Sequence, residues 1–324
     1  MSDGCPYGAR YDLGMDSLEK IDLSTLLTES RNPASSRLDE LSTLEMLEVI
    51  NDEDAKVAAA VREELPAIAA AIDEIAERFG RGGRLFYIGA GTSGRLGVLD
   101  ASECPPTFSV PAELVQGLIA GGDQALRLSS EHSEDSFEEG VEDLRAAGFA
   151  KELEGGKRAP DVLVGIAASG RTPYVLGAMR YAKELGCLTV GLSCVPRSEV
   201  ARAAEIAITP AVGPEVVTGS TRLKAGTATK LVLNMISTGV MVRGGAVYGN
   251  LMVNVKPTNA KLVDRAIRIV AGAAEVSHER AVVLFEQSGR EVKTAIVMSR
   301  LGLGRAEAEV LLEKSDGVLG RVLR

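Results

Sequence analysis

The chain has 324 residues, of which 45% are hydrophobic and 25% charged, a composition that fits a globular protein with a substantial core and excludes a mostly disordered or collagen-like chain. Its formal net charge of -9 argues against a nucleic-acid partner or an anionic lipid surface, because both carry phosphate and repel an acidic protein. The four cysteines form no C-x-x-C pair and no apolar run reaches about 18 residues, so we expect no zinc finger, no membrane span and a cytoplasmic protein with reduced thiols.

Two helices are predicted first. Ser42 and Glu45 stand three residues apart in a Ser-Thr-Leu-Glu run, the pattern of a capping box, so a helix is expected to begin there and to stop at the acidic break 51–54. A second helix, ended by the glycines of 80–83, carries an apolar stripe at steps of three and four. Its members are Leu65, Ile68, Ile72, Ile75 and Phe79. The stripe fits either core packing or a subunit interface.

Three β-rich runs follow, over 84–89, 161–167 and 187–193, and each alternates with a helical stretch. This alternation predicts the α/β class, with a parallel sheet covered by helices on both faces. A long helix over 223–242 closes that unit. Short amphipathic helices are then expected over 259–273, 278–287, 292–301 and 305–314. We therefore divide the chain into an N-terminal arm, residues 1–41, an α/β domain, 42–256, and an all-helical bundle, 257–324.

Two loops after predicted strands are candidates for binding phosphate. Residues 89–94 match G-x-G-x-x-G, but the acid that a dinucleotide site needs about 20 residues later is missing, so we reject that function. What recurs is Ser-Gly-Arg, at Ser93 and again at Ser169. Hydroxyls and backbone N–H groups at a helix start suit a phosphomonoester, although each serine could also simply cap its helix.

A third turn, 218–230, is dense in hydroxyls and is expected to face the same cavity. Lys224, Lys230 and Lys256 are candidates to close on the phosphate, without a spacing argument that ranks them. Phosphate anchoring alone gives marginal affinity, so further contacts are expected. The predicted substrate-binding residues are Gly91, Thr92, Ser93, Glu131, Ser169, Gly170, Arg171, Thr172, Ser220, Thr221 and Lys224.

Two carboxylates, Glu103 and Glu134, are the candidate acid and base. Each could equally be a solvated charge at a helix end. A helix from Ser93 to Glu103 would separate the two residues by about 15 Å, beyond the reach of a hexose phosphate. Either the helix is shorter and the chain turns back at Pro105 and Pro106, or Glu103 serves a site shared with a second subunit.

Several long motifs stand in order along the chain: Ser42-Thr-Leu-Glu-Met46, Ile50-Asn-Asp-Glu-Asp54, Gly89-Ala-Gly-Thr-Ser-Gly-Arg-Leu-Gly97, Asp100-Ala-Ser-Glu-Cys-Pro-Pro-Thr107, Gly165-Ile-Ala-Ala-Ser-Gly-Arg-Thr-Pro-Tyr174 and Thr218-Gly-Ser-Thr-Arg-Leu-Lys-Ala-Gly-Thr227. From about Leu27 to the C-terminus the chain resembles the N-acetylmuramic acid 6-phosphate etherase family. The resemblance implies the sugar isomerase (SIS) fold, a similarity to the glucokinase regulatory protein, and a C-terminal bundle like a ubiquitin-associated domain.

The resemblance implies a lyase that cleaves the D-lactyl ether of N-acetylmuramic acid 6-phosphate during cell-wall recycling, without a metal or organic cofactor. It places the proton donor at Glu103 and the second catalytic acid at Glu134. We expect Glu134 to remove the C2 proton and Glu103 to protonate the departing lactate, with swapped roles left open. The fold family and the apolar stripe suggest a homodimer. The alternatives are a sugar-phosphate isomerase and a non-catalytic sugar-phosphate sensor on the same fold.

Overall fold

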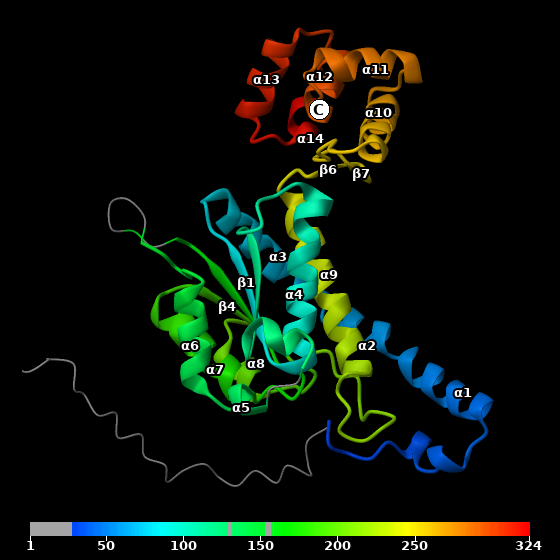
Figure 1. Cartoon of the computed structure of the whole chain (residues 1–324), viewed down its shortest axis with the longest axis vertical. Coiled ribbons are helices and arrows are strands. Elements are labelled where there is room, and N and C mark those ends of the chain that lie inside the picture. The colour runs from blue at the N-terminus through cyan, green and yellow to red at the C-terminus, as the bar shows by residue number, and fades with distance from the viewer. Residues whose placement is uncertain (1–27, 129–130, 153–156, 158) are drawn as a thin grey trace, which may run out of the picture.

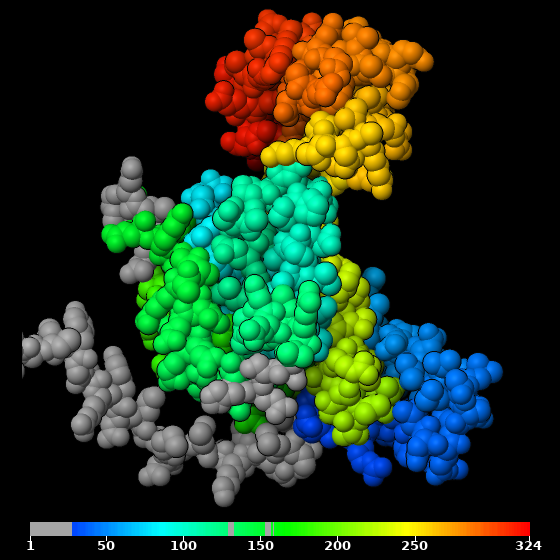
Figure 2. Space-filling view, in the orientation of Figure 1, coloured from blue at the N-terminus to red at the C-terminus, as the bar shows by residue number. Residues whose placement is uncertain are grey.

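The computed structural model describes residues 28–128, 131–152, 157 and 159–324, with the side chains of 131 and 132 left out. Figure 1 shows an α/β body, with α1 (Thr43–Asp54) projecting from one end and the C-terminal helices gathered at the other. In the space-filling view the C-terminal helices meet the body over a narrow junction (Figure 2).

The body is built on a parallel sheet of five strands in the order β2-β1-β3-β4-β5. The strands are β1 (Leu85–Gly89), β2 (Val115–Ile119), β3 (Val162–Ile166), β4 (Leu188–Leu192) and β5 (Ile206–Ile208). Three of them lie within the predicted runs, so the expected α/β class is confirmed. All residues of β1, β3 and β4 are buried, as expected where helices cover both faces.

Helices cover the two faces of the sheet in separate clusters. On one face, Leu85 and Tyr87 pack in a cluster with α2, α3, α4 and α9; on the other, Phe86 and Ile88 pack with α6 and α7. The helices concerned are α2 (Val57–Glu63), α3 (Leu65–Gly80), α4 (Gly91–Phe108), α6 (Phe137–Ala146), α7 (Pro173–Glu184) and α9 (Lys224–Arg243). Alternate side chains of β1 thus point to opposite layers.

The first N-terminal helix follows the prediction at both ends. Ser42 caps α1, and its backbone N–H donates to Glu45 Oε2 at 2.9 Å, which confirms the capping box. Residues 51–54 form the last turn of α1, which ends at Asp54, and Glu53 in that turn is buried in an ion pair. In the apolar stripe, Ile68 and Ile75 are buried in the core. Core packing therefore accounts for them.

The C-terminal helices have their own apolar cluster, which includes Ala266, Phe285 and Ile296. The cluster also takes in Val253 and Val255, which follow a short hairpin that the sequence pattern does not predict. The elements are β6 (Val247–Tyr248), β7 (Leu251–Met252), α10 (Ala260–Ala274), α11 (His278–Gln287), α12 (Val292–Leu301), α13 (Arg305–Lys314) and α14 (Leu319–Val322). The four predicted helices agree with α10 to α13 within one residue.

The remaining described elements are short: η3 (Pro33–Ser35), η4 (Leu38–Glu40), η5 (Gly122–Leu126), α5 (Glu131–Glu134) and α8 (Glu199–Ala203). Among the described helices, none is long and apolar enough to cross a membrane.

Candidate active site

The two Ser-Gly-Arg loops lie side by side because they follow neighbouring strands. Gly89 at the end of β1 pairs with Ile166 at the end of β3. The first loop enters α4 directly at Gly91, and its glycines allow close packing, since a Cβ on Gly94 would lie 2.5 Å from the Gly89 carbonyl oxygen. The last glycine of the literal G-x-G-x-x-G motif therefore allows close packing of α4 against β1.

A cavity of about 330 Å³ opens between these loops and the third hydroxyl-rich turn. Its lining joins residues from five separate stretches of the chain. These residues are Glu29, Ala90, Gly91, Thr92, Ser93, Glu134, Ala168, Ser169, Thr172, Gly219, Thr221, Gly226 and Thr229. Hydroxyls and the N-terminus of the 18-residue helix α4 thus surround one space of the size of a small sugar phosphate.

Glu134 brings a carboxylate into this cavity. It ends α5, and its Oε1 accepts a hydrogen bond of 3.3 Å from the Thr172 hydroxyl, at the start of α7. Thr172 is itself buried, so the bond fixes one carboxylate oxygen at the wall of the cavity. Glu131, the predicted substrate contact one turn earlier, has its side chain outside the described part of the structure. The arrangement suits a group that takes up or releases a proton.

Glu103 does not line the cavity that holds Glu134. Helix α4 runs unbroken through Pro105 and Pro106 to Phe108, so the expected alternative in which the chain turns back at the prolines is wrong. Each of these prolines removes one i→i−4 backbone hydrogen bond from the last two turns of α4. Glu103 lines a second cavity, of about 270 Å³, between α4 and α9. The two predicted catalytic carboxylates are not brought together within one chain.

The Glu103 cavity has a polar network at its base. Its other lining residues are Leu96, Leu99, Asp100, Lys230, Leu233 and Asn234. Asp100 accepts hydrogen bonds from the Tyr87 hydroxyl at 2.9 Å and the Ser237 hydroxyl at 3.0 Å. Burial raises the pKa of Asp100, and these hydrogen bonds oppose it. Burial likewise raises the pKa of Cys104 to about 12, so this thiol stays protonated and is a poor nucleophile.

The arginines of the repeated motif do not line the cavity of about 330 Å³. Arg95 Nε donates to the Leu126 carbonyl oxygen at 3.1 Å. Arg171, a predicted substrate contact, pairs with Glu199 at 3.0 Å and lines a separate cavity of about 160 Å³. Gly170 adopts φ +71, and a Cβ there would lie 2.2 Å from Ser198, so this glycine shapes the loop. Ser93 and Ser169 line the cavity, whereas Arg95 and Arg171 bond to residues outside its lining.

Lys224 is placed differently from the prediction. Its ammonium is buried, with 1% of the side chain exposed, and lies 2.6 Å from Glu53 Oε2. The lysine is therefore not a lining residue of the cavity, because a buried ammonium needs its anion close by. Ser220 is not a lining residue either, whereas its neighbours Gly219 and Thr221 are.

Sequence reasoning missed six of the lining residues: Glu29, Ala90, Ala168, Gly219, Gly226 and Thr229. Gly226 and Thr229 lie three residues apart on α9, so helical spacing brings both to the face of the helix that lines the cavity. Glu29 precedes every predicted element and carried no signal.

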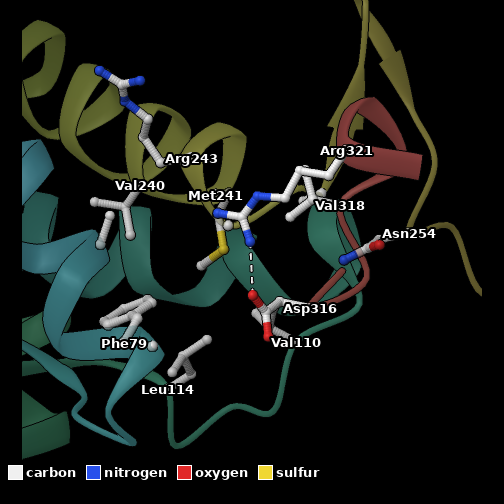
Figure 3. A pocket seen from close by; sticks show the side chains of 14 residues that line it. Phe79, Val110, Leu114, Val240, Met241, Arg243, Asn254, Asp316, Val318 and Arg321 are labelled. Carbon is white, nitrogen blue, oxygen red and sulfur yellow. Dashed lines mark hydrogen bonds and ion pairs between the residues drawn. The ribbon is translucent and has the colours of Figure 1, made fainter. Parts of the chain in front are cut away.

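A larger cavity, of about 430 Å³, lies at the junction with the C-terminal helices and contains none of the predicted site residues (Figure 3). Phe79, Leu114 and Val240 give it apolar walls, and Arg321 pairs across it with Asp316 at 2.7 Å. Within the described residues, no group of three or more His, Cys, Asp or Glu is arranged to hold a metal ion.

The fold and the hydroxyl-lined cavity define an SIS-type domain, and residues 67–183 match the family model for the glucokinase regulatory protein N-terminal SIS domain. Two bacterial proteins named N-acetylmuramic acid 6-phosphate etherase are similar over nearly their whole length. The protein of Clostridium beijerinckii is 54% identical over 95% of this chain and 98% of its own. That of Photorhabdus laumondii is 56% identical over 93% and 97%. The chain belongs to the N-acetylmuramic acid 6-phosphate etherase family.

Proposed function

We propose that the protein is a lyase that cleaves the D-lactyl ether of N-acetylmuramic acid 6-phosphate, giving N-acetylglucosamine 6-phosphate and D-lactate. The observation that carries the proposal is the cavity in which Ser93, Ser169 and Thr221 surround one space beside the carboxylate of Glu134, in a chain of this family. The hydroxyls and the α4 N-terminus would hold the phosphate, because they offer hydrogen-bond donors and the positive end of a helix dipole.

The chemistry needs one base and one acid. In the open-chain sugar the C1 aldehyde acidifies the C2 proton, which Glu134 removes. The electron pair forms the C2–C3 double bond as the C3–O bond breaks, and Glu103 protonates the departing lactate oxygen. Water then adds at C3 and a proton returns to C2. Each proton transfer typically contributes about 10²–10⁴-fold in rate. Both roles come from the protein's own carboxylates, and no metal or organic cofactor has a part in this sequence of steps.

We propose further that the working unit is a homodimer with a shared site. Glu103 is about 15 Å along α4 from Ser93, too far for one sugar phosphate to reach both within a chain. The apolar side chains of Leu96, Leu99 and Leu233 line the Glu103 cavity, and Leu99 of α4 is 48% exposed. A second copy packed on this face would cover Leu99 and carry Glu103 toward its partner's cavity. We place this dimer in the cytoplasm, where the thiols of Cys104 and Cys194 stay reduced.

The test is release of D-lactate from N-acetylmuramic acid 6-phosphate by the purified full chain in excess chelator. Stoichiometric release supports the etherase and makes a required metal untenable. Tight binding of the sugar phosphate without release would favour a sensor, and interconversion of an aldose and ketose phosphate would favour an isomerase. Either of these two results would overturn the proposal.

A further inference from the structure

A buried ion pair lies behind the cavity wall. Lys224 Nζ lies 2.6 Å from Glu53 Oε2, and both side chains are almost fully buried. Lys56 pairs with the other oxygen of Glu53 from the surface. The amide nitrogen of Asn32, also buried, donates to Glu53 Oε2 at 2.9 Å and to the Pro214 carbonyl oxygen at 3.0 Å. One carboxylate thus joins three segments that are far apart in the sequence.

A second buried carboxylate holds the start of α9. Glu215 accepts a hydrogen bond from the backbone N–H of Lys224 at 3.0 Å and from that of Ala225 at 2.9 Å. These are the first two residues of the helix, so their N–H groups have no partner within it. Because Glu215 takes these donors, the first two amides of α9 are committed to the protein and are not offered to a ligand.

Two parts of the cavity wall are attached to this cluster. Glu29 lies three residues before Asn32, and Thr221 lies three residues before Lys224. The two parts meet at Gly219, since Glu29 Oε2 is 3.2 Å from the position that a Cβ on Gly219 would take. The Thr221 carbonyl oxygen also accepts from the Gly226 N–H at 3.0 Å, which joins the turn to α9.

We propose that the buried Lys224–Glu53 pair is a positioning device that holds Glu29 and the 219–221 turn at the cavity for substrate binding. Neither charge lines the cavity, so neither touches the substrate; both act through Asn32 and the start of α9. The inference rests on the proposed sugar-phosphate site. It predicts that the pair affects the KM for the sugar phosphate more than kcat.

The decisive variant replaces both charges, as Glu53→Gln together with Lys224→Met. Removing one partner leaves an unpaired buried charge and endangers folding, whereas removing both does not. In the folded double variant we expect the KM for N-acetylmuramic acid 6-phosphate to rise about tenfold, with kcat within about threefold of wild type, because binding groups are displaced while Glu134 stays in place. An unchanged KM would overturn the proposal. If the double variant does not fold, the same criterion applies to Asn32→Ala, which removes the link from Glu53 to the segment that carries Glu29 and keeps the ion pair.

The matched control is another buried pair, Arg84 with Asp161 at 2.7 Å, at the opposite end of the strands. Arg84→Met with Asp161→Asn should lower stability and leave the KM unchanged. An equal rise in the KM of this control would mean that losing any buried ion pair weakens substrate binding, and would contradict a positioning role for Lys224 and Glu53. Calorimetry with N-acetylglucosamine 6-phosphate separates failure of the proposed function from failure of the positioning role. If wild type neither binds it nor releases lactate, the proposed function fails; if wild type does both and the double variant matches it, only the positioning role fails.

Discussion

Glu103 and Glu134 line different cavities of the same chain, the first between α4 and α9 and the second between the two serine loops. The separation follows from one continuous helix, since α4 carries Ser93 near its start and Glu103 five residues before its end. In the proposed shared site, a second chain would supply Glu103 to the cavity that holds Glu134.

Mixing two inactive variants tests the shared site. Glu103→Gln keeps the cavity intact, and Ser169→Ala keeps Glu103 intact. Random exchange of subunits makes half of the dimers mixed, each with one complete site, so about a quarter of the wild-type rate of lactate release should return. The variants measured separately are the control. A mixture no more active than the sum of its parts contradicts a shared site.

Isotope exchange separates the base from the acid. Glu134→Gln should abolish exchange of the C2 proton with deuterated solvent, because the amide cannot accept that proton, and should lower kcat by about 10²–10⁴-fold. Glu103→Gln should retain C2 exchange and lose lactate release. Proton magnetic resonance of the sugar reads both steps in one sample. Continued exchange in the Glu134 variant would assign the base to another residue.

The hydrogen bond from Thr172 to Glu134 predicts a role in placing the base. Thr172→Val removes the donor and keeps the shape, so kcat should fall about 3–10-fold with little change in KM. Thr172→Ser keeps the hydroxyl and should retain most of the activity. If the valine variant instead raises KM at constant kcat, the hydroxyl binds substrate and does not orient the carboxylate.

Gly94 predicts a packing constraint between β1 and α4. A methyl group there would lie 2.5 Å from the Gly89 carbonyl oxygen and 2.7 Å from Ile119, so Gly94→Ala should lower the free energy of unfolding by about 1–3 kcal/mol. Gly80→Ala is the matched control, because nothing lies within 4 Å of its added Cβ. Urea denaturation measures both. Equal midpoints for the two variants would show that the strand and helix separate at little cost.

The buried cluster predicts a stability that depends on pH. Burial acts to raise the pKa of Glu53, but hydrogen bonds from Lys224, Lys56 and Asn32 outweigh it and lower the pKa to about 2. A lowered carboxylate pKa stabilises the folded state above the unfolded pKa of about 4.5 and loses that contribution as the pH falls toward about 2. Urea midpoints should fall more steeply over this window in wild type than in Glu53→Gln. Parallel slopes would contradict the role of Glu53.

Much of the fold follows from local sequence patterns. Alternating β-rich and helical runs predict the parallel sheet, and the capping box at Ser42 places the start of α1 correctly. Strand β5 has only three residues and the β6–β7 hairpin has two per strand, lengths at which periodicity carries little information. The acidic run 51–54 marks the end of α1 but does not indicate that Glu53 is buried, because its partner Lys224 is 171 residues away.

The candidate site can be predicted only in part from the sequence, again because some of its contacts join residues far apart in the chain. Ser93, Ser169 and Thr221 are found because each lies in a short hydroxyl-rich loop whose position after a strand or before a helix is visible locally. Whether Lys224 or Arg171 faces the ligand depends on distant acids, Glu53 and Glu199, that compete for the cation. A local motif therefore identifies the loop. Ion pairs with residues far along the chain determine which of its side chains can contact a ligand.

The pairing of Gly89 with Ile166 also bears on how the site tolerates sequence change. The ends of β1 and β3, where the two serine loops begin, are about 4.8 Å apart, the spacing of neighbouring strands, and hydrogen bonds between peptide groups maintain it. Replacing side chains in the sheet alters its stability but not this interval. The separation at which the two loops leave the sheet is therefore a property of the backbone, and side chains around the cavity can change without altering it.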